Sequence, residues 1–174
     1  MPGAIEWPSG ARWDRGIAVR VTGRVLYSSR SYEGDIPMVS ADTDNERTVL
    51  EFFRILSTGD LEAIRQTLHD EVTWTPQVKD IPGAGTYHGK KGVCDDFLGP
   101  VRGMFAPGDP KTTVKTIVSR GPLVMCESEG LGKLADGRTY HNRYAWAVEV
   151  RDGKIFAIRE YMDSHYVAKL FGVV

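Results

Sequence analysis

The sequence lacks the features that identify several protein classes. It has only two cysteines, Cys94 and Cys126, so it cannot form a disulfide scaffold, and no Cys or His cluster has zinc-finger spacing. We interpret both cysteines as buried thiols of a reducing compartment, and we therefore expect a cytoplasmic protein. No apolar run approaches the roughly 18 residues that span a bilayer. No continuous apolar segment follows a basic start, which argues against a secretory signal.

Charge of one sign is not in excess. The chain has 22 Lys and Arg against 23 Asp and Glu, so we expect neither nucleic acid nor a membrane as partner. No P-loop, no G-x-G-x-x-G motif and no H-x-x-x-H motif is present, so we expect no cofactor and no metal. With 41% hydrophobic and 26% charged residues, the composition is typical of a soluble globular protein.

The first 42 residues differ in composition from the rest. Residues 1–37 contain five Arg, three Pro and no Lys, and they show no helical period. We expect residues 1–42 to be a dispensable N-terminal extension, so that a chain beginning at Met38 would still fold. Residues 43–174 would then form one domain.

Helical patterns begin at residue 43. Thr43 and Glu46 fit a capping box, which marks the start of a helix. Further apolar stripes predict a second helix at 61–68 and a third at 93–105, which Gly99-Pro100 should end or kink. The first helix shows its apolar stripe at Val49, Phe52, Phe53 and Leu56.

The second half of the chain is typical of strands. Asp136-Gly137 and Asp152-Gly153 are hairpin signals, because glycine accepts a positive φ. Helices followed by an antiparallel meander predict an α+β fold, with the helices on one face of a curved sheet. We expect strands at Val72–Thr75, Thr112–Ser119, Leu123–Leu131, Arg138–Val150 and Lys154–Ser164, and a last helical turn near Tyr166.

Three passages carry a resemblance to a known family: residues 49–64 leading to Asp70-Glu71-Val72-Thr73-Trp74, then Gly85-Thr86-Tyr87-His88-Gly89, then 136–144 with 152–155 and 159–163. Together they resemble the SnoaL-like branch of the NTF2-like superfamily, which is similar in outline to ketosteroid isomerase, limonene-epoxide hydrolase and polyketide cyclases. Over residues 43–172 the resemblance implies a cone-shaped barrel of a curved, mainly antiparallel sheet. Three N-terminal helices would pack on its concave face around a ligand pocket. It also implies a homodimer through the other face of the sheet.

The sequence departs from the catalytic patterns of those relatives. Phe52 stands where ketosteroid isomerase has a tyrosine, and Thr75-Pro76 stands where it has its aspartate base. Alignment on the hairpin glycines places Glu127 at the arginine of limonene-epoxide hydrolase, and Glu129 and Glu160 at its two aspartates. Because these catalytic residues are replaced, we carry over neither mechanism unchanged. The fold alone does not determine the reaction.

Strand alternation groups the candidate catalytic acids. Glu127 and Glu129 share one face of their strand, and the family register turns that face, together with Glu160, toward the pocket. Burial and like charge would then raise at least one carboxyl pKa, so a proton donor and an acceptor would coexist near neutral pH. We expect Glu129 to be the main acid or base, and Glu160 to orient it or a water molecule.

Other side chains would hold the substrate. Tyr144 and Asn142 could form hydrogen bonds to a carbonyl or hydroxyl oxygen. Asp163, as a turn cap or a pocket acid, and His141, as a catalytic or dimer-interface residue, are secondary candidates. The full set of expected substrate-binding residues is Tyr144, Asn142, Trp74, Trp146, Phe53 and Met162.

Structural roles remain open for several of these residues. Because acids are rarely buried, Glu127 and Glu129 could instead face water. Glu160 could form an ion pair with Arg143 or Arg159, and Trp74 could simply pack in the core.

Two classes of function follow from the sequence. One is an enzyme of the isomerase, dehydratase (lyase), cyclase or hydrolase type, which uses carboxylate acid–base catalysis on a small, largely apolar, oxygen-bearing molecule. The alternative is a non-catalytic module that binds a small ligand or acts as a dimeric interaction domain.

Overall fold

The computed structural model describes residues 39–173 of the chain. The N-terminal extension expected at residues 1–42 therefore lies, except for its last four residues, outside the described part. Between residues 39 and 173, no helix combines the length and the apolar character needed to cross a membrane.

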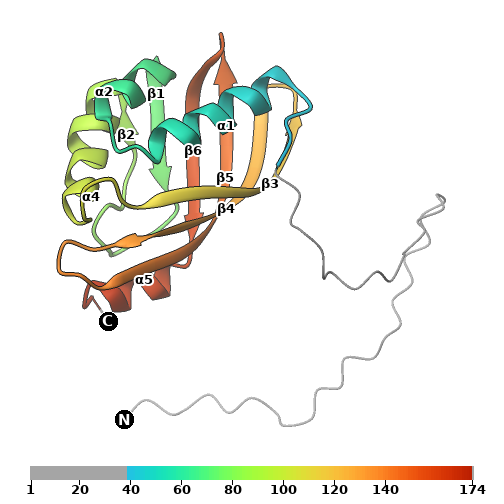
Figure 1. Cartoon of the computed structure of the whole chain (residues 1–174). Helices are drawn as coiled ribbons and strands as arrows, with labels where there is room; N and C mark the ends of the chain where they lie inside the picture. The colour runs from blue at the N-terminus through green and yellow to red at the C-terminus, as the bar shows by residue number, and fades with distance from the viewer. Residues whose placement is uncertain (1–38, 174) are drawn as a thin grey trace, which may run out of the picture. The chain divides into compact units, whose positions relative to one another are not determined.

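Within residues 39–173 the strands form one curved, mixed sheet in the order β2-β1-β6-β5-β4-β3, which does not close on itself (Figure 1). The strands β3 to β6 form the expected antiparallel meander, whereas β1 pairs with β6 in parallel. This agrees with the α+β fold and the mainly antiparallel sheet that the sequence predicts. The strands are β1 (Leu68–Pro76), β2 (Tyr87–His88), β3 (Lys111–Arg120), β4 (Leu123–Lys133), β5 (Thr139–Arg151) and β6 (Lys154–Met162).

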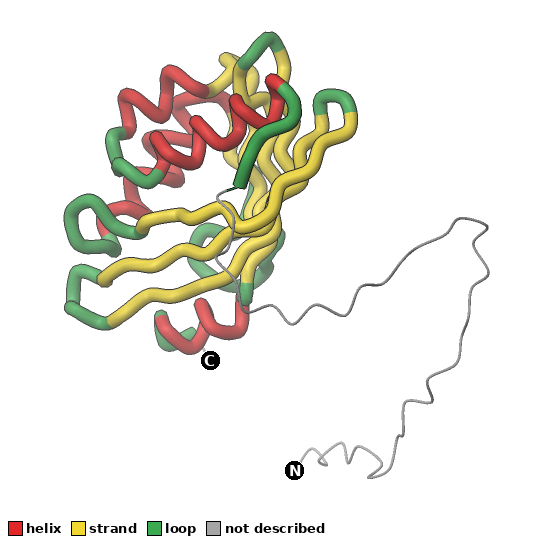
Figure 2. The backbone as a smooth tube through the Cα atoms, turned by 45° about the vertical axis from the view of Figure 1, so that its right-hand side comes forward, coloured by secondary structure: helices red, strands yellow, loops and turns green. Residues whose placement is uncertain are grey.

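The helices before β3 lie on the concave side of the sheet, as Figure 2 shows. Helix α1 begins at the expected capping box, in which Glu46 N–H donates to the Thr43 hydroxyl over 3.2 Å and the Glu46 carboxylate accepts from Thr43 N–H. The helical segments are α1 (Asp44–Leu56), α2 (Leu61–Thr67), α3 (Gly89–Lys91), the π-helix η1 (Gly92–Leu98), α4 (Gly99–Gly103) and α5 (Ser164–Leu170).

The third predicted helix is a composite of α3, η1 and α4. Pro100 lies in the first turn of α4, directly after the π-turn of η1, and the chain stays helical through Gly99-Pro100. The π-turn before it closes with a hydrogen bond from Gly99 N–H to Cys94 O. The composite helix connects β2 to β3.

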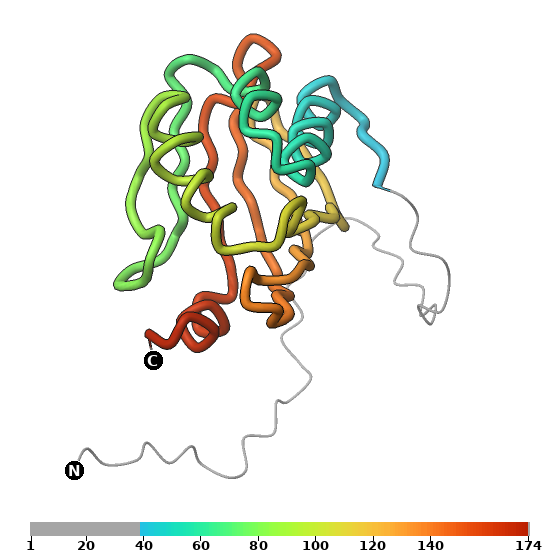
Figure 3. The backbone as a smooth tube through the Cα atoms, turned by 60° about the vertical axis from the view of Figure 1, so that its left-hand side comes forward, coloured from blue at the N-terminus to red at the C-terminus, as the bar shows by residue number. Residues whose placement is uncertain are grey.

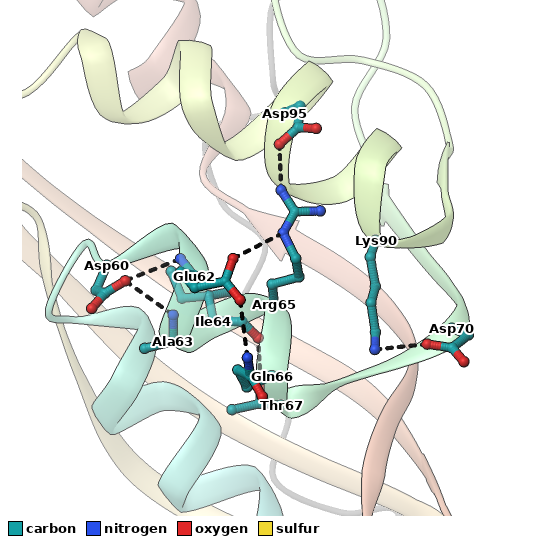
Figure 4. Close-up of polar contacts among 10 residues, drawn as sticks. All are labelled: Asp60, Glu62, Ala63, Ile64, Arg65, Gln66, Thr67, Asp70, Lys90 and Asp95. Carbon is teal, nitrogen blue, oxygen red and sulfur yellow. Dashed lines mark hydrogen bonds and ion pairs between the residues drawn. The ribbon is translucent and has the colours of Figure 1, made fainter.

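Helix α2 is fixed at both ends by polar contacts (Figure 4). Asp60 caps it by accepting from the N–H groups of Glu62 and Ala63 over 3.0 Å each. Arg65 pairs with both Glu62 and Asp95, which ties α2 to η1. These partly exposed pairs contribute about 0–1 kcal/mol each, so they position the helix more than they stabilise the fold.

An aromatic core fills the space between α1 and the sheet. The ring centroids of Phe53 and Trp146 are 5.1 Å apart, and those of Trp74 and Trp146 are 6.0 Å apart in an edge-to-face arrangement. Helix α5 follows β6 directly and lies at the lower end of the sheet (Figure 3). This arrangement leaves a hollow between the core, the composite helix and α5.

Candidate functional site

The hollow is a cavity of about 320 Å³ with mostly apolar walls. That volume lies at the lower end of the range of small-molecule sites, roughly 300–1,000 Å³. The loop after β1, the segment from β2 to the loop that precedes β3, the inward faces of β5 and β6, and helix α5 all contribute to it. Aromatic side chains supply much of the surface: Tyr87, Phe97, Phe105, Tyr140, Tyr144 and Phe171.

Glu160 is the buried carboxyl of this cavity. Its side chain lines the cavity, the residue is 6% exposed, and its Oε2 accepts a 2.7 Å hydrogen bond from Trp74 Nε1. Burial raises the pKa of Glu160 to about 7, and the hydrogen bond from Trp74 offsets this only in part. The alternative of an ion pair with Arg159 is not realised, because Arg159 donates instead to Glu149 over 2.7 Å. A carboxyl with this pKa can accept or donate a proton near neutral pH.

Two tyrosines on β5 line the same cavity. Tyr140 and Tyr144 are four residues apart, so both side chains leave the same face of the strand. Their hydroxyls form a hydrogen bond with each other, and Asn142 Nδ2 donates to the Tyr140 hydroxyl over 3.2 Å. Burial raises the pKa of both tyrosines, and the nearby Glu160 charge raises them further, so both hydroxyls are protonated at neutral pH.

Strand register brings the acid and the tyrosines to one side. Trp146 of β5 lies opposite Glu160 of β6, and Tyr144 lies opposite Met162. Because directly paired residues share a face, the carboxyl and the hydroxyls all point to the concave side. A glycine makes room for this, since a Cβ at Gly130 would lie 3.0 Å from a ring carbon of Tyr144.

The prediction that Glu127 and Glu129 face the pocket is wrong. On β4 the inward residues are Val124, Cys126, Ser128 and Gly130, so the two acids point to the outer face. Glu127 is exposed, and Glu129 forms an ion pair with Lys115 at 3.2 Å. No coupled cluster of three acids therefore forms.

The physical reason is the space required by the neighbouring strand. Alternation shows that Glu127 and Glu129 share a face, but it does not show which face is buried. The residues opposite β4 are the bulky Tyr144 and Trp146, and they need small partners. Ser128 meets this need and also accepts a 2.8 Å hydrogen bond from Trp146 Nε1.

The other predicted residues divide between cavity and core. Tyr144 and Met162 line the cavity, whereas Trp74, Trp146 and Phe53 lie in the core at 3% exposure or less and do not line it. Asn142 is also buried, at 2% exposure, and reaches the cavity only through Tyr140.

The two secondary candidates lie elsewhere. Asp163 caps helix α5, accepting from Tyr166 N–H over 2.9 Å, which agrees with its reading as a turn cap. His141 is exposed on the outer face, 4.0 Å from Glu129.

Sequence reasoning missed several cavity residues. Strand alternation puts Tyr140 on the same face as Asn142 and Tyr144, which the family register turns toward the pocket, although the expected substrate-binding set leaves it out. Phe97 of η1 and Val167 and Phe171 near the C-terminus give no such signal, since their contribution depends on how the helices pack.

Comparison with known proteins places this site in context. The model of the SnoaL-like domain family matches residues 49–158. Among solved structures, TerC co-crystallised with polyporic acid is 20% identical, with a TM-score of 0.64 over 74% of this chain and 98% of that chain. A candidate isomerase from Bacillus subtilis is 18% identical, with a TM-score of 0.64 over 74% of this chain and 93% of that chain.

A candidate SnoaL-like polyketide cyclase from Jannaschia sp. CCS1 is 17% identical, with a TM-score of 0.61 over 82% of this chain and 96% of that chain. No curated protein matches the sequence. At these identities the similarity establishes the fold, and the chemistry has to be argued from the residues in the cavity.

Proposed function

The chain belongs to the SnoaL-like domain family, and we propose that it is an enzyme that transfers a proton within a small, largely apolar substrate carrying a carbonyl or hydroxyl oxygen. Solved structures with this fold include a candidate isomerase and a candidate polyketide cyclase. Glu160 would be the acid–base residue, and the hydroxyls of Tyr140 and Tyr144 would bind the substrate oxygen.

The observation that carries the proposal is the environment of Glu160. This carboxyl is buried in an apolar cavity, no cation pairs with it among residues 39–173, and its pKa is about 7. An acid–base catalyst is most effective when its pKa lies near the working pH. A carboxyl that served only as a structural ion pair would have its pKa lowered by its partner, which is the opposite direction.

The residues present suit proton transfer at a carbon next to a carbonyl. The Glu160 carboxylate removes a proton from that carbon, and the C–H electron pair becomes the new carbon–carbon double bond while the carbonyl π electrons move onto oxygen. A tyrosine hydroxyl stabilises the enolate oxygen by donating a hydrogen bond. In an enolate that is conjugated with a second double bond, the Glu160 carboxylic acid then returns the proton to the far carbon, which completes an isomerisation. Return to the first carbon restores the substrate and is seen only as hydrogen exchange. Cyclisation through the enolate would begin with the same first step.

Exchange of hydrogen for deuterium tests the first step without the natural substrate. We expect the protein to accelerate exchange of the methyl protons of 2-acetylnaphthalene in D₂O, followed by proton NMR. The rate should rise with pH through about 7, because the carboxylate is the active form. Glu160→Gln should lower the rate by about 100-fold or more, the range that a general base contributes.

The matched control is Glu129→Gln, which makes the same chemical change on the outer face, beside Lys115. It should leave the exchange rate unchanged. Binding of the ketone without any acceleration of exchange would contradict the proposal, and it would favour the alternative of a module that binds a ligand without turning it over.

A further inference from the structure

We propose that the Tyr140–Tyr144 pair presents one free hydroxyl proton to the cavity, and that the orientation of the Asn142 amide leaves this proton free for a ligand. The inference rests on the proposed function only in that the cavity takes an oxygen-bearing ligand. It concerns how that oxygen is bound, and it is independent of proton transfer by Glu160.

The orientation of the Asn142 amide is fixed by its backbone neighbour. Arg143 N–H donates to Asn142 Oδ1 over 2.8 Å. A backbone N–H can only donate, so the atom facing it has to be the amide oxygen. The amide NH₂ therefore faces the Tyr140 hydroxyl, 3.2 Å away, and acts as the donor in that contact.

A count of hydroxyl protons shows whether the tyrosine pair can donate a hydrogen bond to a ligand. Tyr140 and Tyr144 carry one hydroxyl proton each, and the hydrogen bond between them uses one, whichever oxygen donates. Asn142 uses none, because it is the donor to Tyr140. One proton is therefore left over, and since both tyrosines line the cavity it is available to a ligand oxygen. Glu160 does not use this proton, because the hydrogen bond that the structure gives its carboxylate comes from Trp74.

The opposite amide orientation would reverse this outcome. If the amide oxygen faced Tyr140, it would accept the Tyr140 proton, and Tyr144 would donate to Tyr140. No hydroxyl proton would then remain, and the cavity would meet lone pairs only. With the amide in its observed orientation, the tyrosine pair favours a ligand group that accepts hydrogen bonds, such as a ketone, over one that can only donate.

Affinity of two ligands of the same shape tests the donor character. We expect the wild-type protein to bind 2-acetylnaphthalene about fivefold or more tightly than 2-isopropylnaphthalene, which corresponds to roughly 1 kcal/mol for one net hydrogen bond. In the double variant Tyr140→Phe/Tyr144→Phe this preference should disappear. Equal affinity of the two ligands for the wild-type protein would overturn the proposal.

The infrared carbonyl band of the bound ketone tests the role of Asn142. The band should lie at lower wavenumber than in cyclohexane, because a hydrogen-bond donor weakens the C=O bond. Asn142→Leu should keep this shift, since removal of the amide leaves the proton count unchanged. Asn142→Asp at pH 9 should lose it, because an ionised carboxylate accepts the free proton. If Asn142 had only a structural role, both variants would change the carbonyl band in the same way. Retention of the full shift in Asn142→Asp would contradict the proposal.

The test separates this inference from the proposed function. Glu160→Gln should abolish proton exchange but keep both the ligand preference and the infrared shift. If exchange is lost but the carbonyl band stays shifted, the role of Asn142 is still supported. If the protein catalyses exchange but the carbonyl band is not shifted, only the role of Asn142 is contradicted.

Discussion

Glu160 makes the stability of the protein depend on pH. In the unfolded chain its pKa is near the ordinary value of 4.5, whereas burial raises the pKa to about 7 in the folded protein. The folded state therefore holds this proton more tightly. Below pH 4.5 the carboxyl is protonated in both the folded and the unfolded protein, so no charge is buried on folding. Stability then falls as the pH rises from about 4.5 through about 7, because the buried group has to ionise.

Replacement of Glu160 by Gln should remove this dependence. Gln keeps the oxygen that accepts from Trp74 Nε1 but carries no charge. We expect Glu160→Gln to raise the free energy of unfolding at pH 8 by roughly 3 kcal/mol and to change it little at pH 4. Urea unfolding at both pH values measures the difference. Glu129→Gln is the control, and a variant Glu160→Gln that is less stable than wild type at pH 8 would show that the carboxylate is favourably paired.

For single residues, the sequence predicts which side chains share a face of a strand better than it predicts which face is buried. It predicts Glu160, Tyr144 and Met162 as pocket residues, and all three line the cavity. The same alternation argument failed for Glu127 and Glu129, because a period of two leaves the choice of buried face open. That choice depends on the volumes of the facing side chains on the next strand, such as Trp146, which a single strand does not reveal.

Among the elements, helix α5 connects local stability with the cavity. It has seven residues, which is too short for a helix to be stable by itself, so it depends on its cap and its packing. Asp163 supplies the cap, and Val167 and Phe171 lie against the cavity. Loss of the cap should therefore loosen one wall of the site.

Asp163→Ala should cost about 1 kcal/mol of stability, as the loss of a helix cap usually does, and should weaken binding of 2-acetylnaphthalene. The reason is that Val167 and Phe171 lose their fixed position. Calorimetric titration and hydrogen exchange over residues 164–171 measure both effects. Asp60→Ala removes the equivalent cap of α2, which does not line the cavity, so it should destabilise the protein to a similar extent with unchanged affinity. Equal loss of affinity in both variants would contradict this role of α5.

Local sequence motifs predict the ends of helices and strands well where a capping or turn residue stands at the boundary. The capping box at Thr43 and the Asp-Gly turns at 136–137 and 152–153 lie at the observed boundaries. Glycine at 137 and 153 has φ of 87° and 68°, the region in which it is favoured. The π-turn of η1 had no such mark, since its apolar residues also fit an ordinary helix.

For the whole molecule, the pairing of distant segments is what local patterns cannot give. The order of helices and strands predicts the α+β class, but the parallel pairing of β1 with β6 joins segments about 85 residues apart. Trp74 pairs with Ile158 because both side chains are buried in the same core, and no local sequence period indicates this pairing. The resemblance to the SnoaL-like family supplied the curved, mainly antiparallel sheet with helices on its concave face, but not this parallel pair.

The outer face of the sheet carries several exposed apolar side chains that the proposed function does not use. It exposes large apolar side chains from three strands: Val118 at 59%, Met125 at 40%, Leu131 at 55% and Tyr161 at 45%. Acids and bases lie between them, with Glu129 beside Lys115. Apolar groups interspersed with both signs of charge suit a self-complementary contact, because a two-fold axis can bring each charge against its opposite.

We propose that this outer face binds a second copy of the chain. Val118 and Met125 are directly paired across β3 and β4, so a double substitution by lysine places two charges side by side on this face. Burial of those charges would be unfavourable, and we expect Val118→Lys/Met125→Lys to be a monomer where the wild-type protein is a dimer. Analytical ultracentrifugation at tens of micromolar protein measures the mass. Gln66→Lys adds a positive charge to the exposed surface of α2, on the helical side, and should leave the dimer intact. A wild-type protein that sediments as a monomer at this concentration, or a dimer that survives both lysines, would show that the two copies do not meet through this face.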